Sequence, residues 1–401
     1  MKRRFILIGI FAIIVVGLVI SYFTFFNNRD LRGGFQCDVS PGEWVPQQGE
    51  CQNNPELQNK CNEFCSKHSE CCPGFAGNNY ATSQGGSGQT LLPLPSESEI
   101  NSLTRNYPTT IKAINEGVNI YPTNEAPSVI SDDELQKIKD SGFSIVQVYL
   151  IGRWNNGKIM FNDVNNAILL NDIVAIKKNG LAVWVALDPS GGKEINLSGY
   201  DYQEYKSAYM NLVNLSSSLM EKYKIEYLTV NNELDHFFTL ENVSESNLVD
   251  IYPATNELAR KNFNGKLINK ITEPRMHTEE MLTASLKNVD IAGVDVGPFI
   301  SENRPLSDYK EQFNDYQFYA TKAAAAEIPW MNAEYWMGDF ETKPSQYVRE
   351  HELEYAIIPF DYYLNITPRG VGYTYNDFST FSWQPQGEQT RLAIKNFLAK
   401  I

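Results

Sequence analysis

Two glutamates follow short apolar segments with the character of β-strands, and together they could support acid–base chemistry. Glu233 ends the segment Leu228-Thr-Val-Asn-Asn-Glu233, and Glu334 ends the segment Ile328-Pro-Trp-Met-Asn-Ala-Glu334. A pair of carboxyl groups facing one cavity can divide the work, because one donates a proton while the other attacks in its ionised form. Cleavage of a glycosidic bond needs such a pair. The pattern predicts a catalytic couple, provided that the fold brings both segments to one edge.

The two segments belong to a longer alternation of short β-branched stretches with helical ones, which begins at about residue 107. The expected strands are Gly117–Tyr121, Ser144–Leu150, Ala182–Leu187, Glu226–Asn231, Lys266–Ile271, Val289–Val296, Trp330–Ala333 and Gly370–Tyr375. The expected helices are Ser131–Ser141, Asp163–Lys178, Tyr202–Lys222, Asn247–Asn262, Asp308–Ala326, Gln346–Ile357 and Glu388–Lys400. Eight strands that alternate with helices predict an α/β fold, a (β/α)8 TIM barrel. A doubly wound open sheet alternates in the same way, but no G-x-G-x-x-G fingerprint opens the first helix.

The carboxyl ends of the strands form the active-site edge of such a barrel. Glu233 follows the fourth expected strand and Glu334 the seventh, so both reach this edge. The other residues that we expect to bind substrate there are Asn232, Arg153, Trp154, Asp188, Asp295, Trp336, Tyr375 and Trp383. There is no H-x-H motif and the chain has only 4 His, so a metal-dependent hydrolase is disfavoured and no metal or cofactor is expected.

The pair Asn232-Glu233 after strand four and Glu334 after strand seven resemble the clan A glycoside hydrolases, which are retaining (β/α)8 enzymes. The resemblance covers roughly residues 107 to 401 and no part of the chain before them. It implies that Glu233 is the general acid/base and Glu334 the nucleophile of a double displacement. It also implies that Asn232 binds the 2-hydroxyl of the reacting sugar and that Trp383 forms the floor of its subsite. A buried core tryptophan is the competing interpretation of Trp383.

The sequence departs from this clan after strands three and six. Many members carry a histidine and a His-x-Tyr motif there, whereas this chain has Asp188 and Asp295. Tyr375 or Tyr335 could replace the tyrosine that normally touches the nucleophile. Arg153 could hold Glu334 ionised, or it could be a surface cation.

Two alternatives to a glycosidase remain open. The barrel could bind glycans at the cell surface without cleaving them. It could also be a lyase or aldolase, which would need a lysine at a strand end to form a Schiff base, and Lys270 on the partly polar fifth strand is the candidate.

The amino-terminal segment, residues 1–30, predicts a signal anchor. Lys2-Arg3-Arg4 precede an almost unbroken apolar run, Phe5–Phe26, that is long enough to cross a bilayer as a helix. No A-x-A cleavage site follows, which favours an uncleaved anchor over a removed signal peptide. Since basic residues stay on the cytoplasmic side, we expect a single-pass protein of the cell membrane whose barrel is extracytoplasmic.

Residues 31–73 predict a small disulfide-rich module, and residues 74–106 a flexible linker. The chain has 6 Cys. They are Cys37, Cys51, Cys61, Cys65, Cys71 and Cys72. Six cysteines allow many pairings, and a zinc site is disfavoured because only His68 accompanies them. Gly, Ser and Pro dominate the linker, which leads to the predicted barrel over residues 107–401.

The formal net charge of −14 argues against a nucleic-acid partner, because such partners bind basic faces. The 22 Tyr, 21 Phe and 6 Trp suit stacking on sugars, although most aromatics in a large domain are buried in the core. The expected partners are therefore a carbohydrate substrate and, through the anchor, a membrane.

Overall fold

The computed structural model describes residues 92–115, 129–155, 158–161, 163–188, 201–239, 244–295, 313–334, 352–376 and 388–401. They lie in one compact unit, Thr90–Ile401. The predicted anchor, the cysteine module and most of the linker fall outside these residues. Within the described ranges, no helix combines the length and the apolar character of a membrane span.

The centre of this unit is a closed barrel of parallel strands. The strands are β1 (Ile111–Asn115), β2 (Ile145–Asn155), β4 (Ala182–Asp188), β5 (Tyr227–Thr229), β6 (Lys266–Thr272), β7 (Ile291–Asp295), β8 (Trp330–Glu334) and β9 (Gly372–Asn376). Each pairs in parallel with its neighbours, and β1 closes the ring by pairing with both β2 and β9. A further strand, β3 (Lys158–Phe161), pairs antiparallel with the far end of β2. The predicted barrel is confirmed.

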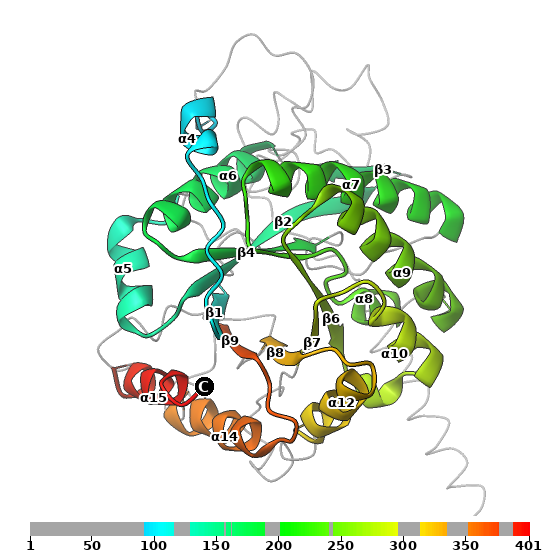
Figure 1. The fold of residues 1–401 in the computed structure, drawn as a ribbon. Helices are drawn as coiled ribbons and strands as arrows, with labels where there is room; N and C mark the ends of the chain where they lie inside the picture. The colour runs from blue at the N-terminus through cyan, green and yellow to red at the C-terminus, as the bar shows by residue number, and fades with distance from the viewer. Residues whose placement is uncertain are drawn as a thin grey trace, which may run out of the picture. The chain divides into compact units, whose positions relative to one another are not determined.

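Helices surround the barrel strands (Figure 1). The longer ones are α5 (Asp132–Asp140), α6 (Asp163–Lys178), α7 (Tyr202–Lys222), α9 (Glu245–Asn262), α12 (Asn314–Ala325), α14 (Glu352–Asn365) and α15 (Glu388–Leu398). The short ones are α4 (Glu97–Asn101), α8 (Leu234–Thr239), α10 (Glu279–Ser285) and the 3-10 turn Pro274–Met276. Polar residues fix their starts: the Ser131 hydroxyl accepts a hydrogen bond from Glu134 N at the start of α5, and Asp201 and Glu204 form a capping box on α7.

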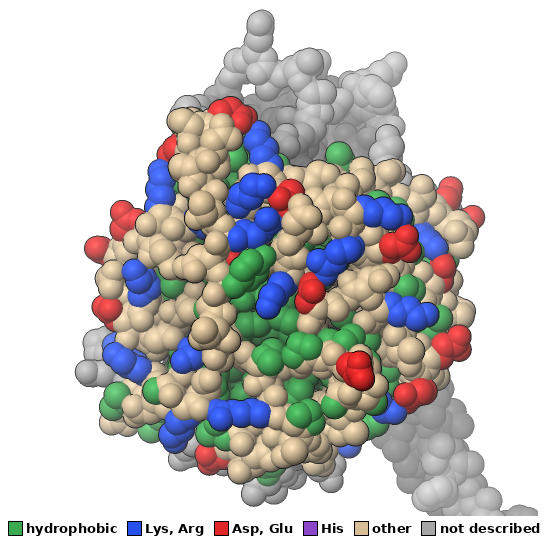
Figure 2. Space-filling model, in the orientation of Figure 1, with side chains coloured by type: hydrophobic (Ala, Val, Ile, Leu, Met, Phe, Trp, Pro, Cys, Tyr) green, Lys and Arg blue, Asp and Glu red, His purple; other side chains and the backbone are tan. Residues whose placement is uncertain are grey.

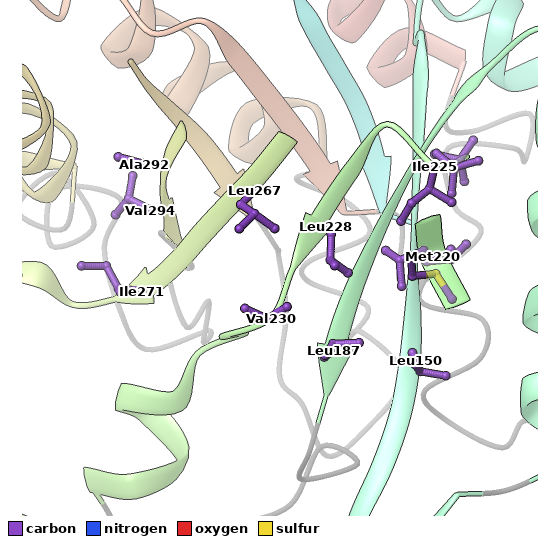
Figure 3. Packing of buried hydrophobic residues seen from close by; sticks show 14 of the residues in the cluster. Leu150, Leu187, Met220, Ile225, Leu228, Val230, Leu267, Ile271, Ala292 and Val294 are labelled. Carbon is purple, nitrogen blue, oxygen red and sulfur yellow. The ribbon is translucent and has the colours of Figure 1, made fainter. Parts of the chain in front are cut away.

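Alternate residues of each strand face opposite sides, which gives the barrel two apolar layers. The layer inside the barrel consists of Ile111, Ala113, Ile145, Ala182, Trp184, Tyr227, Ile268, Ile291, Met331 and Ala333. The larger layer lies between strands and helices, where residues such as Leu150, Leu187, Leu228 and Leu267 pack (Figure 3). An inward-facing side chain above the inner layer therefore points into the mouth of the barrel.

The first strand lies earlier than the sequence predicted. The strand that closes the barrel is Ile111–Asn115, and the expected range Gly117–Tyr121 falls outside the described residues. The stretch contains Lys112 and ends in Asn115, so it looks less apolar than a buried strand usually does. Its register with β2 and β9 nevertheless fixes it as the first barrel strand.

Residues 92–106, expected to be linker, pack instead against the amino end of the barrel. The Arg105 guanidinium pairs with Glu221, the Asn106 N–H donates to Glu226 Oε1 at 2.7 Å, and the Tyr107 ring stands edge-on to Tyr227 with centroids 5.8 Å apart. In Figure 1 this segment crosses the face turned to the viewer. Figure 2 shows hydrophobic side chains near the centre of that face, with lysine and arginine side chains around them. We call this face the floor of the barrel.

Candidate active site

Glu233 lies just beyond β5, in a backbone conformation that is unusual for glutamate. Its φ is 49°, in the left-handed region that side chains other than glycine rarely adopt. Two backbone contacts hold it there: Asn232 forms a parallel bridge with Lys270, and Glu233 N donates to Lys270 O at 3.2 Å. Strain that the surrounding structure maintains is typical of functional positions.

A β-bulge directs Glu334 into the mouth. In the pairing of β7 with β8, Val294 lies opposite Asn332 and Asp295 opposite Glu334, so Ala333 is an extra residue. Ala333 already faces the barrel interior. In a regular strand the next residue would face the helices, whereas the bulge lets Glu334 face inward as well.

Lys270, on β6, connects the two glutamates. Its side chain is completely buried and follows Ile268 on the inward-facing side of the strand. Its Nζ lies 2.5 Å from Glu233 Oε1, and it also pairs with Glu334 Oε2. The sequence offered this lysine only as a Schiff-base candidate. A lysine in a strand usually looks like a solvated residue, so its ion pairs could not be foreseen.

Asp295, at the end of β7, is the third acid of this cluster. The carboxylate oxygens of Glu233, Asp295 and Glu334 that face each other all lie within 4.8 Å of one another. Burial raises the pKa of Asp295 well above its ordinary range, and the charge of Glu233 adds to the effect while Lys270 opposes it. Acids this close need a proton or a cation among them, and Lys270 provides a cation from the protein itself.

Asp295 Oδ1 and Asn232 Oδ1 are among the buried oxygens near the mouth that have no hydrogen bond with the described residues. The two residues are 7% and 3% exposed. Buried acceptors are normally paired, so unpaired ones in a cavity are available to the hydroxyl groups of a ligand.

Tyr149, on β2, is a site residue that the sequence reasoning missed. Its hydroxyl donates to Glu334 Oε2 at 3.3 Å and accepts from Asn115 Nδ2 at 2.6 Å. Burial raises the pKa of Tyr149 well above the ordinary value, and the charge of Glu233 acts in the same direction. The hydroxyl therefore remains a donor. Gln147 and Tyr149, at alternate positions of an otherwise apolar strand, were the signal that could have indicated it.

Tyr375 does not join the carboxylates. It lies opposite Ile114 in the pairing of β9 with β1, and both residues belong to the apolar layer between strands and helices. The substrate-binding role expected of Tyr375 is therefore not supported. Tyr149 makes the contact with Glu334 for which Tyr375 and Tyr335 were considered.

Asp188 does reach the mouth. It ends β4, is 3% exposed, and shares the inward-facing side of that strand with Ala186 and Trp184. Its charge helps to raise the pKa of Tyr149.

Four other expected site residues cannot be placed at the site. Arg153 and Trp154 have their backbone in β2, but their side chains fall outside the described part of the chain. Trp336 and Trp383 lie wholly outside it. The cation described beside Glu334 is Lys270, in the role that was considered for Arg153.

Behind Glu233, a second polar cluster fixes helix α8. The buried Asp235 carboxylate accepts from Tyr252 Oη at 3.0 Å and from Thr272 N at 2.7 Å, and it lies 3.2 Å from His277 Nε2. Burial alone would lower the pKa of His277, but the hydrogen bond to Asp235 and the charges of Asp235 and Glu245 raise it overall. This cluster ties the backbone that carries Glu233 to the end of β6.

Several solved structures with a similar fold are glycoside hydrolases, whereas no protein-family model and no curated protein matches the chain. A glycoside hydrolase family 113 β-1,4-mannanase is 13% identical, with a TM-score of 0.51, over 73% of this chain and 99% of that one. A glycoside hydrolase family 5 enzyme from Prevotella bryantii B14 is 13% identical, with a TM-score of 0.50, over 76% and 98%. A family 5 lichenase from a Caldicellulosiruptor species, solved with cellotetraose, is 11% identical, with a TM-score of 0.50, over 74% and 96%.

Structural similarity at such low identity shows the fold alone. The chemistry must be argued from the residues of this chain. The likeness covers nearly the whole of each of those enzymes and about three quarters of this chain. The chain therefore shares the (β/α)8 barrel of these glycoside hydrolases.

Proposed function

We propose that the barrel is a glycoside hydrolase that cleaves O-glycosidic bonds of an oligosaccharide or polysaccharide by double displacement with retention. The observation that carries the proposal is the pair of carboxylates in the mouth, with oxygens of Glu233 and Glu334 within 4.8 Å of each other. Retaining enzymes hold their two carboxyl groups about 5–5.5 Å apart, whereas inverting enzymes need about 6.5–9.5 Å to admit a water molecule. The similar solved barrels, which include a mannanase and a lichenase, support a carbohydrate substrate.

In this proposal Glu334 is the nucleophile. Its carboxylate pairs with Lys270 and accepts a hydrogen bond from Tyr149, and both contacts favour the ionised form that attacks the anomeric carbon. The side chain is 6% exposed, so little water competes for it.

Glu233 is then the general acid/base. It protonates the leaving oxygen in the first step and removes a proton from the attacking water in the second. Its side chain, 13% exposed, is the more accessible of the two, as an acid that meets both leaving group and water should be. Asn232, next to it, has an Oδ1 that accepts no hydrogen bond from the described residues and that suits a sugar hydroxyl.

The test replaces each glutamate singly by glutamine and measures hydrolysis of aryl β-glycosides and polysaccharides. We expect Glu334→Gln to lose nearly all turnover on every substrate. We expect Glu233→Gln to lose about 10²–10⁴-fold on glycosides with poor leaving groups and much less on activated aryl glycosides, whose departure needs no proton. Glu257→Gln, which removes an exposed carboxylate on α9, is the matched control.

The anomeric form of the first product, observed by NMR, tests retention. Full activity in Glu334→Gln would reject the assignment, and a product of inverted configuration would reject the double displacement. Oligosaccharide binding without any turnover in the wild-type protein would favour the alternative, a glycan-binding surface protein on the same barrel.

Lys270 favours a second candidate function, an enzyme that forms a Schiff base with a carbonyl substrate. The observation is a buried lysine among acids that could shuttle protons. A Schiff base needs a free amine, however, and Lys270 Nζ is held in ion pairs with two carboxylates. Treatment with borohydride and small aldehydes or ketones, followed by mass spectrometry of the peptide containing Lys270, discriminates between the two: a reduced adduct would support the lyase or aldolase.

We also propose that residues 1–30 anchor the protein in the membrane and that the barrel lies on the extracytoplasmic side. In this proposal the cysteine module, residues 31–73, lies between the anchor and the barrel in the chain. The support comes from the sequence: a basic cluster before Phe5–Phe26, and six cysteines that suit an oxidising compartment. Fractionation after an alkaline wash and accessibility of the barrel to added protease test this. A protein released by the wash would contradict the anchor.

A further inference from the structure

We propose that Asp295 stores the proton used by the site and passes it to Glu233 when a glycoside binds. The inference rests on the proposed function, since it explains how one member of the catalytic couple becomes an acid. In this role Asp295 acts through Glu233, so it is a positioning residue for the proton transfer.

The need for a proton store follows from Lys270. Its ammonium group pairs with both Glu233 and Glu334. This suits Glu334, which must attack as an anion. It does not suit Glu233, which must carry a proton when the glycosidic bond breaks. Another group must therefore hold that proton while the site is empty.

Asp295 is placed to do so. Its carboxylate lies within 4.8 Å of both glutamates, and its side chain is buried at the end of β7. The described ion pairs of Lys270 go to Glu233 and Glu334, and Asp295 Oδ1 has no hydrogen bond with the described residues. A buried carboxyl without compensating contacts is more stable in its neutral form.

The charges facing Asp295 act mostly in the same direction. Glu233 from the end of β5, Asp235 from α8 and Glu273 from the end of β6 all raise the pKa of Asp295, and Lys270 from β6 lowers it. Glu334 from β8 adds another carboxylate, and the hydroxyl of Tyr149 from β2 is neutral. Burial remains the largest cause.

The transfer itself is a simple exchange. The proton leaves an Asp295 oxygen, crosses one bridging water molecule and bonds to a Glu233 oxygen, so that Asp295 becomes the carboxylate and Glu233 the acid. No electrons are transferred and the total charge of the cluster is unchanged. Lys270 then faces the Glu334 and Asp295 anions, and Glu233 is free to protonate the leaving oxygen. The water consumed in the second step returns the proton.

A measurement without substrate tests the location of the proton. The carboxyl carbon of Asp295 is followed by NMR in protein labelled at aspartate, with Asp295→Asn used to assign the signal. We expect a protonated Asp295 through neutral pH. Titration in the ordinary range of aspartate, about 3.9, would overturn the inference.

Two variants sharpen this measurement. Glu233→Gln removes a charge that raises the pKa of Asp295, so its titration should move to lower pH. Lys270→Met removes the charge that lowers it, so the titration should move to higher pH. Asp315→Asn is the matched control: burial also raises the pKa of Asp315, but this residue pairs with Arg275, and its loss should leave the Asp295 signal unchanged. A shift to higher pH in Glu233→Gln or to lower pH in Lys270→Met, or no shift in either variant, would overturn the inference.

The role in turnover is tested by the pH profile of kcat/KM for Asp295→Asn. We expect a loss of about 10²-fold on glycosides with poor leaving groups and a change in the limb that reports the acid, with little loss on activated aryl glycosides. If the role of Asp295 were purely structural, its replacement would lower kcat/KM equally on both kinds of substrate and leave the pH profile unchanged. That result would contradict the inference. Unaltered activity on all substrates would contradict it as well.

The two proposals fail in different ways. Hydrolysis that depends on Glu233 and Glu334, together with an ionised Asp295, would leave the glycosidase standing and reject the proton store. A protonated Asp295 in a protein that cleaves no glycoside would reject the glycosidase and, with it, the use of that proton in catalysis.

Discussion

Two buried lysines lie at opposite ends of the barrel, and their surroundings differ. At the floor, Lys177 Nζ donates to Glu226 Oε1 at 2.6 Å and to Lys224 O at 2.8 Å. Glu226 also accepts from the backbone N–H groups of Asn106 and Val183, so both of its oxygens are paired. The two charged side chains are 5% and 1% exposed. This is a closed ion pair that joins α6, β4, β5 and the segment before β1.

At the mouth, Lys270 is equally buried but its surroundings are incomplete. It pairs with two carboxylates, a third lies beside them, and oxygens of Asp295 and Asn232 have no hydrogen bond with the described residues. A saturated buried pair has no capacity left for a ligand, whereas an unsaturated one does. The difference is the one expected if the floor pair serves the fold and the mouth cluster has the proposed role in catalysis.

The largest effect that the comparison predicts is on stability at the floor. Glu226→Ala leaves the Lys177 ammonium buried without its partner and two backbone N–H groups unpaired, so we expect a loss of about 3–5 kcal/mol in the free energy of unfolding. Glu233→Ala at the mouth should cost less, because Lys270 keeps Glu334 as a partner. Urea unfolding at neutral pH measures both. Equal losses would remove the distinction between the two ends.

A smaller effect is expected at His277, which lies behind the mouth. Its pKa is raised in the folded protein by Asp235 and Glu245, so its stabilising contribution is fully present below the ordinary histidine pKa and is lost as pH rises through the raised value. His277→Gln should therefore destabilise the protein by about 1–2 kcal/mol at about pH 5 and by less at about pH 9. Urea midpoints at the two pH values test this. A loss independent of pH would mean that the imidazole contributes only by packing.

The smallest predicted effect belongs to the Tyr149 hydroxyl. Tyr149→Phe removes one donor to Glu334 while Lys270 stays, so we expect kcat/KM to fall by about 3–10-fold, the size of one hydrogen bond. The free energy of unfolding should also fall, by about 1 kcal/mol, because Asn115 Nδ2 is left buried without its acceptor. A loss of several hundredfold would mean that the tyrosine, and not the lysine, is the main support of the nucleophile.

The sequence was sufficient for the outer frame of the site. Alternation of β-branched and helical stretches predicted the barrel, and α6 and α7 have the predicted bounds. Strand order alone then brought Glu233 and Glu334 to one edge. The first strand was misplaced because Lys112 and Asn115 interrupt its apolar pattern, and the antiparallel β3 was not predicted at all.

The interior of the site could not be predicted, for reasons that lie in strand register. Whether Tyr375 faces the mouth or the helices depends on its pairing with β1, which a single sequence does not contain. The bulge at Ala333 has no sequence signal, although it decides where Glu334 points. Lys270 lies two residues after Ile268, so both face the same side of the strand. The sequence does not show that a carboxylate lies beside this lysine, and a buried lysine therefore looks like a solvated one.

The left-handed backbone at Glu233, with φ of 49°, has an evolutionary consequence. Glycine or asparagine would relax such a conformation, which costs a larger side chain about 1–3 kcal/mol. In a descendant protein under no selection for turnover, drift should therefore replace Glu233 early. The inactive protein with glycine or asparagine at this position would be more stable than the active protein with glutamate. The persistence of glutamate at this position among related sequences would serve as a marker of retained activity.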